Sequence, residues 1–254
     1  MHYNIKNHVT QTISARANQV HNWLPSDTLE NYSNENNLYK IDEIIYKFND
    51  DGFRCDNFNE LSELPIVFLG CSCTEGIGLP LEQTWSHILY TKIVQATNKK
   101  TPYWNLALGG TGIDTQASLL YWLSKTNKFQ HVFGLLPPFM RREYKLNGPE
   151  LKTRLPNSTN ELQNKIFIDE DFCNHQSYSS LMLIDSLCNA NQSTCNLSYW
   201  GFDKNDINLL SESTLNYLPW QPTNVDFARD NIHYGPTYHK QFADYMWQQT
   251  QHYF

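Results

Sequence analysis

The sequence predicts a three-layer α/β/α sandwich whose sheet is mainly parallel, flavodoxin-like in strand order and made of about five strands. Three observations support this fold class. Short apolar runs end in glycine or proline, amphipathic helical segments alternate with those runs, and neither an internal repeat nor a low-complexity linker interrupts the pattern. Strands that alternate with helices are typical of a parallel sheet joined by right-handed crossovers.

Four strands are predicted from the apolar runs. Leu64–Gly70 is continuous and rich in β-formers, as expected of a strand buried on both faces. Tyr103–Gly110 ends in two glycines, His131–Pro138 ends in two prolines, and Cys195–Phe202 is the fourth run. A shorter run, Ile44–Phe48, meets the residues Asn-Asp-Asp-Gly, which suit a tight turn.

Four helices complete the alternation, and apolar residues recur in them at helical spacing. They are predicted at Leu81–Thr97, Ile113–Thr126, Ser177–Ala190 and Gly235–Gln251. Pro236 falls in the first turn of the last helix, where the N–H that proline lacks would have had no partner within the helix.

Residues 1–60 are polar and irregular, and we interpret them as an N-terminal extension that packs on the core. Residues 61–254 are interpreted as one domain with a polar insert at about 139–178. Structureless connections of this length are usually functional or mobile. The insert could therefore be a lid over the site or an interface with a partner.

The composition disfavours several classes of protein. A formal net charge of -7 disfavours nucleic acid as a partner. No stretch reaches the roughly 20 apolar residues of a membrane helix, and the N-terminal residues lack the apolar core of a secretory signal. The sequence therefore predicts a cytoplasmic protein.

Cys71 and Cys73 follow the first strand and raise the question of a metal or redox site. The chain has six cysteines, with no Cys-x-x-Cys pair and no zinc-like Cys/His spacing. We interpret them as small core residues and expect no metal and no organic cofactor.

Ser72 also follows the first strand, and ligands of an open parallel sheet bind outside the carboxyl ends of its strands. A serine becomes a nucleophile when a base lies within hydrogen-bond reach and a third group orients that base. Asp230 and His233 are three residues apart, just before the last helix, and could face the same crevice. The alternatives are that Ser72 only caps a helix, that His233 is an ordinary loop residue, or that a neighbouring cysteine is the nucleophile.

These residues carry a resemblance to a known family. The sequence Gly-Cys-Ser-Cys-Thr-Glu-Gly at 70–76 resembles the first block of the SGNH/GDSL hydrolases, Gly-Asp-Ser-x-Thr-x-Gly. The segment Asp230–His233 is similar to their last block, Asp-x-x-His, and Asn105–Gly110 is similar to their second block. Tyr46–Arg54 resembles an N-terminal extension that many members have.

The resemblance implies a Ser-His-Asp triad. Ser72 would attack an acyl carbonyl, His233 would take its proton, and Asp230 would hold the imidazole in the required tautomer. The backbone N–H groups of Ser72 and Gly110 would form the oxyanion hole. We expect the Ser72 hydroxyl to lie within hydrogen-bond reach of His233.

Two positions depart from the family pattern. Cys71 replaces the aspartate before the serine, and the third block lacks its asparagine, which is a further oxyanion donor. Pro137 and Pro138 stand there instead, and proline has no backbone N–H. Arg141 or Arg142 could fill this gap or bind an anionic substrate, and the alternative is that both face solvent.

The leading functional hypothesis is a serine esterase that removes a small acyl group from a carbohydrate or lipid. Trp200, Tyr217 and Trp220 could line a sugar-binding cleft or belong to the core. The alternative function is a catalytically degenerate SGNH fold that serves as a binding or structural component of a larger assembly, such as a phage particle. The expected partner is a small-molecule or glycan ester. The sequence also leaves open a homo-oligomer, or assembly into a virion and therefore a location in the virion.

Overall fold

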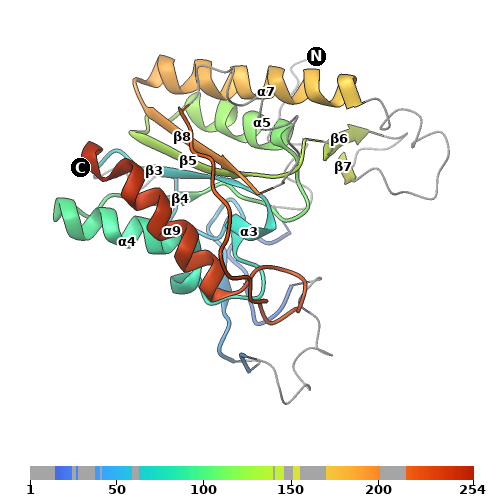
Figure 1. Cartoon of the computed structure of the whole chain (residues 1–254), viewed down its shortest axis with the longest axis vertical. Helices are drawn as coiled ribbons and strands as arrows, with labels where there is room; N and C mark the ends of the chain where they lie inside the picture. The colour runs from blue at the N-terminus through green and yellow to red at the C-terminus, as the bar shows by residue number, and fades with distance from the viewer. Residues whose placement is uncertain are drawn as a thin grey trace.

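A five-stranded parallel sheet lies at the centre of the computed structural model, with a pair of helices on each face (Figure 1). The structure describes residues 15–24, 27, 38–40, 42–58, 63–139, 141–145, 151–154, 170–200 and 216–254. In spatial order the strands are β4 (Tyr103–Asn105), β3 (Ile66–Gly70), β5 (His131–Leu136), β8 (Thr194–Tyr199) and β9 (Asn216–Tyr217). This is the order 2-1-3-4-5 of flavodoxin-like sheets, so the predicted fold class is confirmed.

Side chains of β3 alternate between two hydrophobic clusters, one on each face of the sheet. Val67 and Leu69 point into the cluster under α5 (Ile113–Ser124) and α7 (Glu170–Asn191). Ile66 and Phe68 point into the cluster under α4 (Trp85–Thr97) and α9 (Pro236–Thr250). The continuous apolar run of this strand is thus explained by burial on both sides.

Several elements differ from the sequence prediction. β4 has three residues, and the chain after it stays beside β3, with Leu106 and Leu108 donating to the carbonyls of Phe68 and Gly70 at 2.9 and 3.4 Å. The insert holds an antiparallel pair, β6 (Arg142–Lys145) and β7 (Leu151–Arg154). Helix α7 begins at Glu170, seven residues before the predicted start.

The described part of the N-terminal extension packs on the carboxyl edge of the sheet. Its strands β1 (Val20–His21) and β2 (Tyr46–Lys47) pair antiparallel. The predicted turn forms after β2, where Asn49 Oδ1 accepts hydrogen bonds from the backbone N–H groups of Asp51 and Phe53. The extension shares a small hydrophobic cluster with segments next to Ser72 and Asp230: Leu24, Tyr39, Ile44, Tyr46, Phe48, Ile77, Leu79 and Ala228.

Short helices complete the described chain. They are α3 (Ser72–Glu75), η1 (Leu81–Gln83) and η2 (Gln251–Tyr253). Within the described residues, none of the helices has both the length and the apolar character that crossing a membrane requires.

Candidate active site

Ser72 is the first residue of α3, directly after β3 at the switch point of the sheet. β3 lies between β4 and β5, so its carboxyl end is the point where the strand order reverses, and ligands of open α/β sheets bind at such points. Gly70 has φ 154° and passes so close to Thr74 that an added Cβ would lie 2.0 Å from its Oγ1. The glycine therefore permits the sharp corner that presents Ser72.

The hydroxyl of Ser72 is not used as a helix cap. The N-cap position of α3 is Cys71, with no side-chain capping bond. Ser72 Oγ donates to Cys71 Sγ at 3.9 Å, a long and weak contact, and the side chain keeps a small exposed surface. The structure therefore does not support the capping alternative for this serine.

Asp230 and His233 form a hydrogen-bonded pair in the loop before α9. Asp230 Oδ2 contacts His233 Nδ1, and Asp230 Oδ1 accepts from the backbone N–H groups of Ile232 at 3.1 Å and His233 at 2.9 Å. Burial alone would raise the pKa of Asp230, but these hydrogen bonds outweigh it and hold the pKa below its ordinary value. The carboxylate is buried, whereas the imidazole is partly exposed.

The loop of Asp230 lies against the turn that follows Ser72. Arg229 N–H donates to the carbonyl of Gly78 at 3.1 Å, and a Cβ on Gly78 would lie 3.4 Å from Asp230 N. No hydrogen bond joins Ser72 Oγ and His233 in this structure, and the expectation that they lie within reach of each other, with looser geometry in the apo site, stays a prediction. The hydroxyl points to Cys71 instead, and apo sites often tighten only around a substrate.

Two backbone N–H groups beside Ser72 have no acceptor in the described part of the chain. They belong to Ser72 itself and to Gly110, whose φ of 79° favours glycine. An added Cβ on the neighbouring Gly109 would lie 3.7 Å from Ser72 Cβ, which places this loop next to the serine. These are the two donors that the sequence predicted for an oxyanion hole.

Glu75 fixes that loop and was missed by the sequence reasoning. Its carboxylate accepts from Gly109 N–H at 2.6 Å and pairs with Arg16 of the extension. Glu75 is buried, and it occupies a variable position of the first block, so no motif distinguished it.

Two arginines also hold the site without belonging to it. Arg54 donates to the carbonyls of Glu75, Gly76 and Leu79 at 3.2, 2.7 and 2.9 Å, so it clamps the turn after Ser72. Arg229, next to Asp230, donates to both carboxylate oxygens of Asp27 in the extension. Arg54 lies in the segment that resembles the N-terminal extension of the SGNH/GDSL family. No sequence motif indicated the Asp27–Arg229 pair.

Cys71 and Cys73 flank the serine but are both buried. A hydrogen bond from Cys73 lowers the pKa of Cys71, and the same bond raises that of Cys73. Cys71 has no exposed surface, so its thiol is not presented to a substrate. All six cysteines are free thiols, and no group of metal-ligating side chains was found among the described residues.

His239, on the helix after the site, has a structural contact. Its Nδ1 accepts from Trp85 N–H at 2.9 Å, at the start of α4. Burial lowers the pKa of His239 to about 3, so the ring is neutral. Trp200, Tyr217 and Trp220 are half-buried and pack against the two main clusters.

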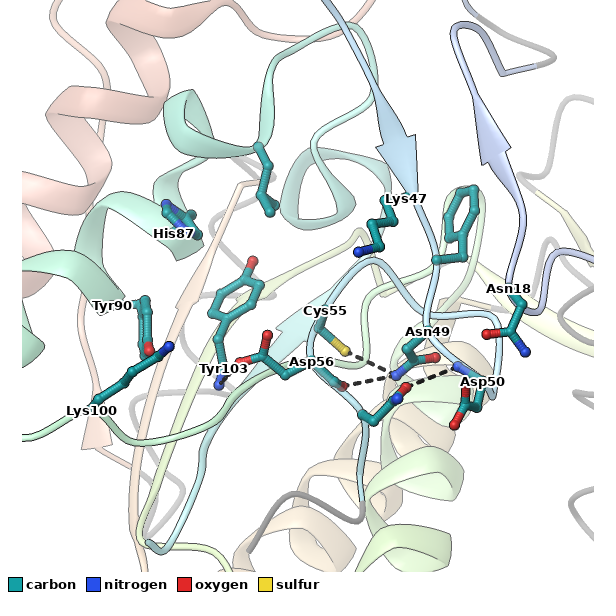
Figure 2. A pocket seen from close by; sticks show the side chains of 13 residues that line it. Asn18, Lys47, Asn49, Asp50, Cys55, Asp56, His87, Tyr90, Lys100 and Tyr103 are labelled. Carbon is teal, nitrogen blue, oxygen red and sulfur yellow. Dashed lines mark hydrogen bonds between the residues drawn. The ribbon is translucent and has the colours of Figure 1, made fainter. Parts of the chain in front are cut away.

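A separate cavity of about 550 Å³ lies between the extension, β4 and α4 (Figure 2). Its lining includes Lys47, Asp56, His87, Tyr90 and Lys100 and none of the three triad candidates. Because positive and negative side chains share this lining, it favours no single class of ligand.

Comparisons with known proteins place the fold. No family model and no curated protein matches the chain. The crystal structure of TesA is 13% identical with a TM-score of 0.52, over 75% of this chain and 99% of that chain. The psychrotrophic esterase EstA from Pseudoalteromonas sp., in a structure inhibited by monoethylphosphonate, is 13% identical with a TM-score of 0.51, over 75% of this chain and 98% of that chain. At this identity the likeness shows the fold alone, a five-stranded parallel sheet between two layers of helices.

Proposed function

We propose that this protein is a serine esterase in which Ser72 is the nucleophile, His233 the general base and Asp230 its orienting carboxylate. One observation carries the proposal. A buried, ionised aspartate holds an imidazole by Nδ1, in a loop packed against the turn that presents an uncapped serine. A structural histidine would not need a partly exposed ring with Nε2 left free.

The roles follow from this geometry. Asp230 accepts the Nδ1–H of His233, so the lone pair of Nε2 is free to take the proton of Ser72 as Oγ attacks the ester carbonyl carbon. Rotation of the serine hydroxyl away from Cys71 is the movement this step requires. The leaving alcohol then takes that proton from Nε2, and water activated by the same nitrogen cleaves the acyl-serine to release the acid.

The negative oxygen of the tetrahedral intermediate needs donors. The unused N–H groups of Ser72 and Gly110 would supply two, each typically worth about 3 kcal/mol of barrier. We propose a small acyl group on a carbohydrate or lipid as the substrate, in keeping with the SGNH resemblance and with the esterase EstA.

The test compares the wild type with Ser72→Ala and His233→Ala on 4-nitrophenyl acetate. Each variant should lose about 10³-fold or more in kcat, because a triad acts as a unit. Matched controls are Ser179→Ala and His175→Ala, two exposed positions on α7 that should keep the wild-type rate.

Labelling gives a second readout that needs no substrate. A fluorophosphonate should modify Ser72, and the Ser72→Ala protein should resist it. Equal ester hydrolysis in wild type and both triad variants, together with no labelling, would contradict the esterase and would favour a binding or structural role in a larger assembly.

A further inference from the structure

Arg141, at the same edge of the sheet, is a partly buried cation that has no partner for its guanidinium in the described part of the chain. It follows β5 and the two prolines, and its backbone N–H donates to the carbonyl of Pro138 at 2.9 Å, a turn that brings the residue back toward the sheet. In the described part of the chain its guanidinium makes no hydrogen bond and no ion pair, although Nη1 is fully buried. The side chain of Arg142 lies outside the described side chains.

Arg141 lies beside the candidate nucleophile. Its positive charge helps to lower the pKa of Cys71 and opposes the rise in the pKa of Cys73, the two residues that flank Ser72. Its backbone carbonyl also approaches Gly112, just after the loop of Gly110, where an added Cβ would lie 2.3 Å from the oxygen.

A second donor accompanies it. The guanidinium carbon of Arg141 is 5.7 Å from the ring centre of Trp200, which follows β8. Trp200 Nε1 is buried and has no nitrogen or oxygen acceptor among the described residues; its one weak acceptor is the thiol of Cys71, whose pKa it lowers. Two buried donors from neighbouring strand ends, one of them charged, therefore meet next to the serine.

Such a pair is destabilising unless something accepts its hydrogen bonds. Buried polar groups are nearly always satisfied, and a buried charge normally has a counter-ion. Neither the described residues nor the proposed triad chemistry supplies a nitrogen or oxygen acceptor for these two donors. The group that fits best is a carboxylate, because the planar guanidinium matches its two oxygens.

We propose that Arg141 and Trp200 form a subsite for a carboxylate of the substrate, so that this site takes an ester whose acyl or alcohol half is acidic. The inference rests on the proposed function, since it names the substrate class of the same site. The rival role, in which Arg141 replaces the missing asparagine as an oxyanion donor, would affect neutral and acidic esters alike.

The kinetic test uses two matched pairs of esters. The acyl pair is mono-4-nitrophenyl adipate and 4-nitrophenyl hexanoate, and the alcohol pair is 4-acetoxybenzoate and its methyl ester. For each pair the ratio of kcat/KM, acidic over neutral, is compared between wild type and Arg141→Gln, so that intrinsic reactivity cancels. In at least one pair the ratio should fall about 10- to 100-fold, as expected for loss of a charge-assisted hydrogen bond.

Two further variants control this result. Lys128→Gln removes the same charge at an exposed position and should leave the ratio unchanged. Arg141→Lys keeps the charge and should retain part of the preference, and it stands in if Arg141→Gln fails to fold. An unchanged ratio in both pairs, including an equal loss for acidic and neutral esters, would overturn the subsite.

Binding separates this inference from the esterase proposal. Monomethyl adipate and methyl hexanoate are titrated into Ser72→Ala protein by calorimetry, with and without Arg141→Gln. The acidic ligand should bind more tightly than the neutral one only when Arg141 is present. If wild type hydrolyses no ester but this binding difference appears, the subsite stands and the esterase falls. Equal binding of both ligands would reject the subsite.

Discussion

Arg229 and Arg141 both lie at the carboxyl edge of the sheet, yet their surroundings differ in kind. Arg229 has no exposed surface, and all three of its nitrogens donate, to Asp27 and to the carbonyls of Asn22 and Lys40. Arg141 has a buried nitrogen that donates to nothing.

The difference shows two uses of a buried charge. A saturated arginine joins segments of the fold, because every donor has an acceptor within the chain. An unsaturated one is a cost to stability that a ligand can offset. The three predictions that follow test this distinction, from the largest expected effect to the smallest.

Asp27→Ala should cause the largest loss of stability. It leaves Arg229 buried without its carboxylate, and breaking a buried ion pair typically costs about 3–5 kcal/mol. Urea unfolding at pH 7 measures this change. The double variant Asp27→Leu/Arg229→Met should recover most of the loss. A cost no larger than that of the exposed control Asp42→Ala would show that the pair does not hold the extension in place.

Arg141→Met should change the free energy of unfolding in the opposite direction. Replacing a partly buried guanidinium, one nitrogen of which is buried without an acceptor, by an apolar side chain of similar length should stabilise the fold by roughly 1 kcal/mol. The same unfolding experiment detects it, with Arg141→Lys as the control that keeps the charge and should bring no gain. A marked destabilisation would mean that Arg141 is a structural residue like Arg229.

The pH dependence of Asp230 should be the smallest effect. Its pKa is lower in the folded chain, so the carboxylate contributes stability that is present above the unfolded pKa of about 3.9 and is lost as pH falls through the folded value. The stability difference between wild type and Asp230→Asn should therefore be constant from pH 7 to 5 and shrink below about pH 4. A difference that grows on acidification would contradict this assignment.

Much of the fold could be predicted, because the strands are continuous apolar runs ended by glycine or proline. The start of α7 could not. Its buried stripe is Cys173, Ser177, Leu181, Ile184 and Cys188, which recur at helical spacing. The first two of these residues, Cys173 and Ser177, carry a thiol and a hydroxyl. The apolar periodicity therefore becomes visible only after the helix has begun.

The site shows the same limit. The nucleophile candidate and the Asp230–His233 pair were predicted, because each lies in a short local pattern. The contacts of Glu75 with Gly109 and Arg16, and that of Asp27 with Arg229, join residues that share no pattern. Only the folded chain brings them together.

The Asp27–Arg229 contact also bears on how the molecule reaches its final state. Its partners are 202 positions apart, and contacts of such separation are slow to form because the entropy of closing a long loop must be overcome first. During synthesis, Ser72 leaves the ribosome long before His233. Under the proposed triad, its hydroxyl would stay an ordinary alcohol until the last helix docks, and a truncated translation product would carry an inert serine.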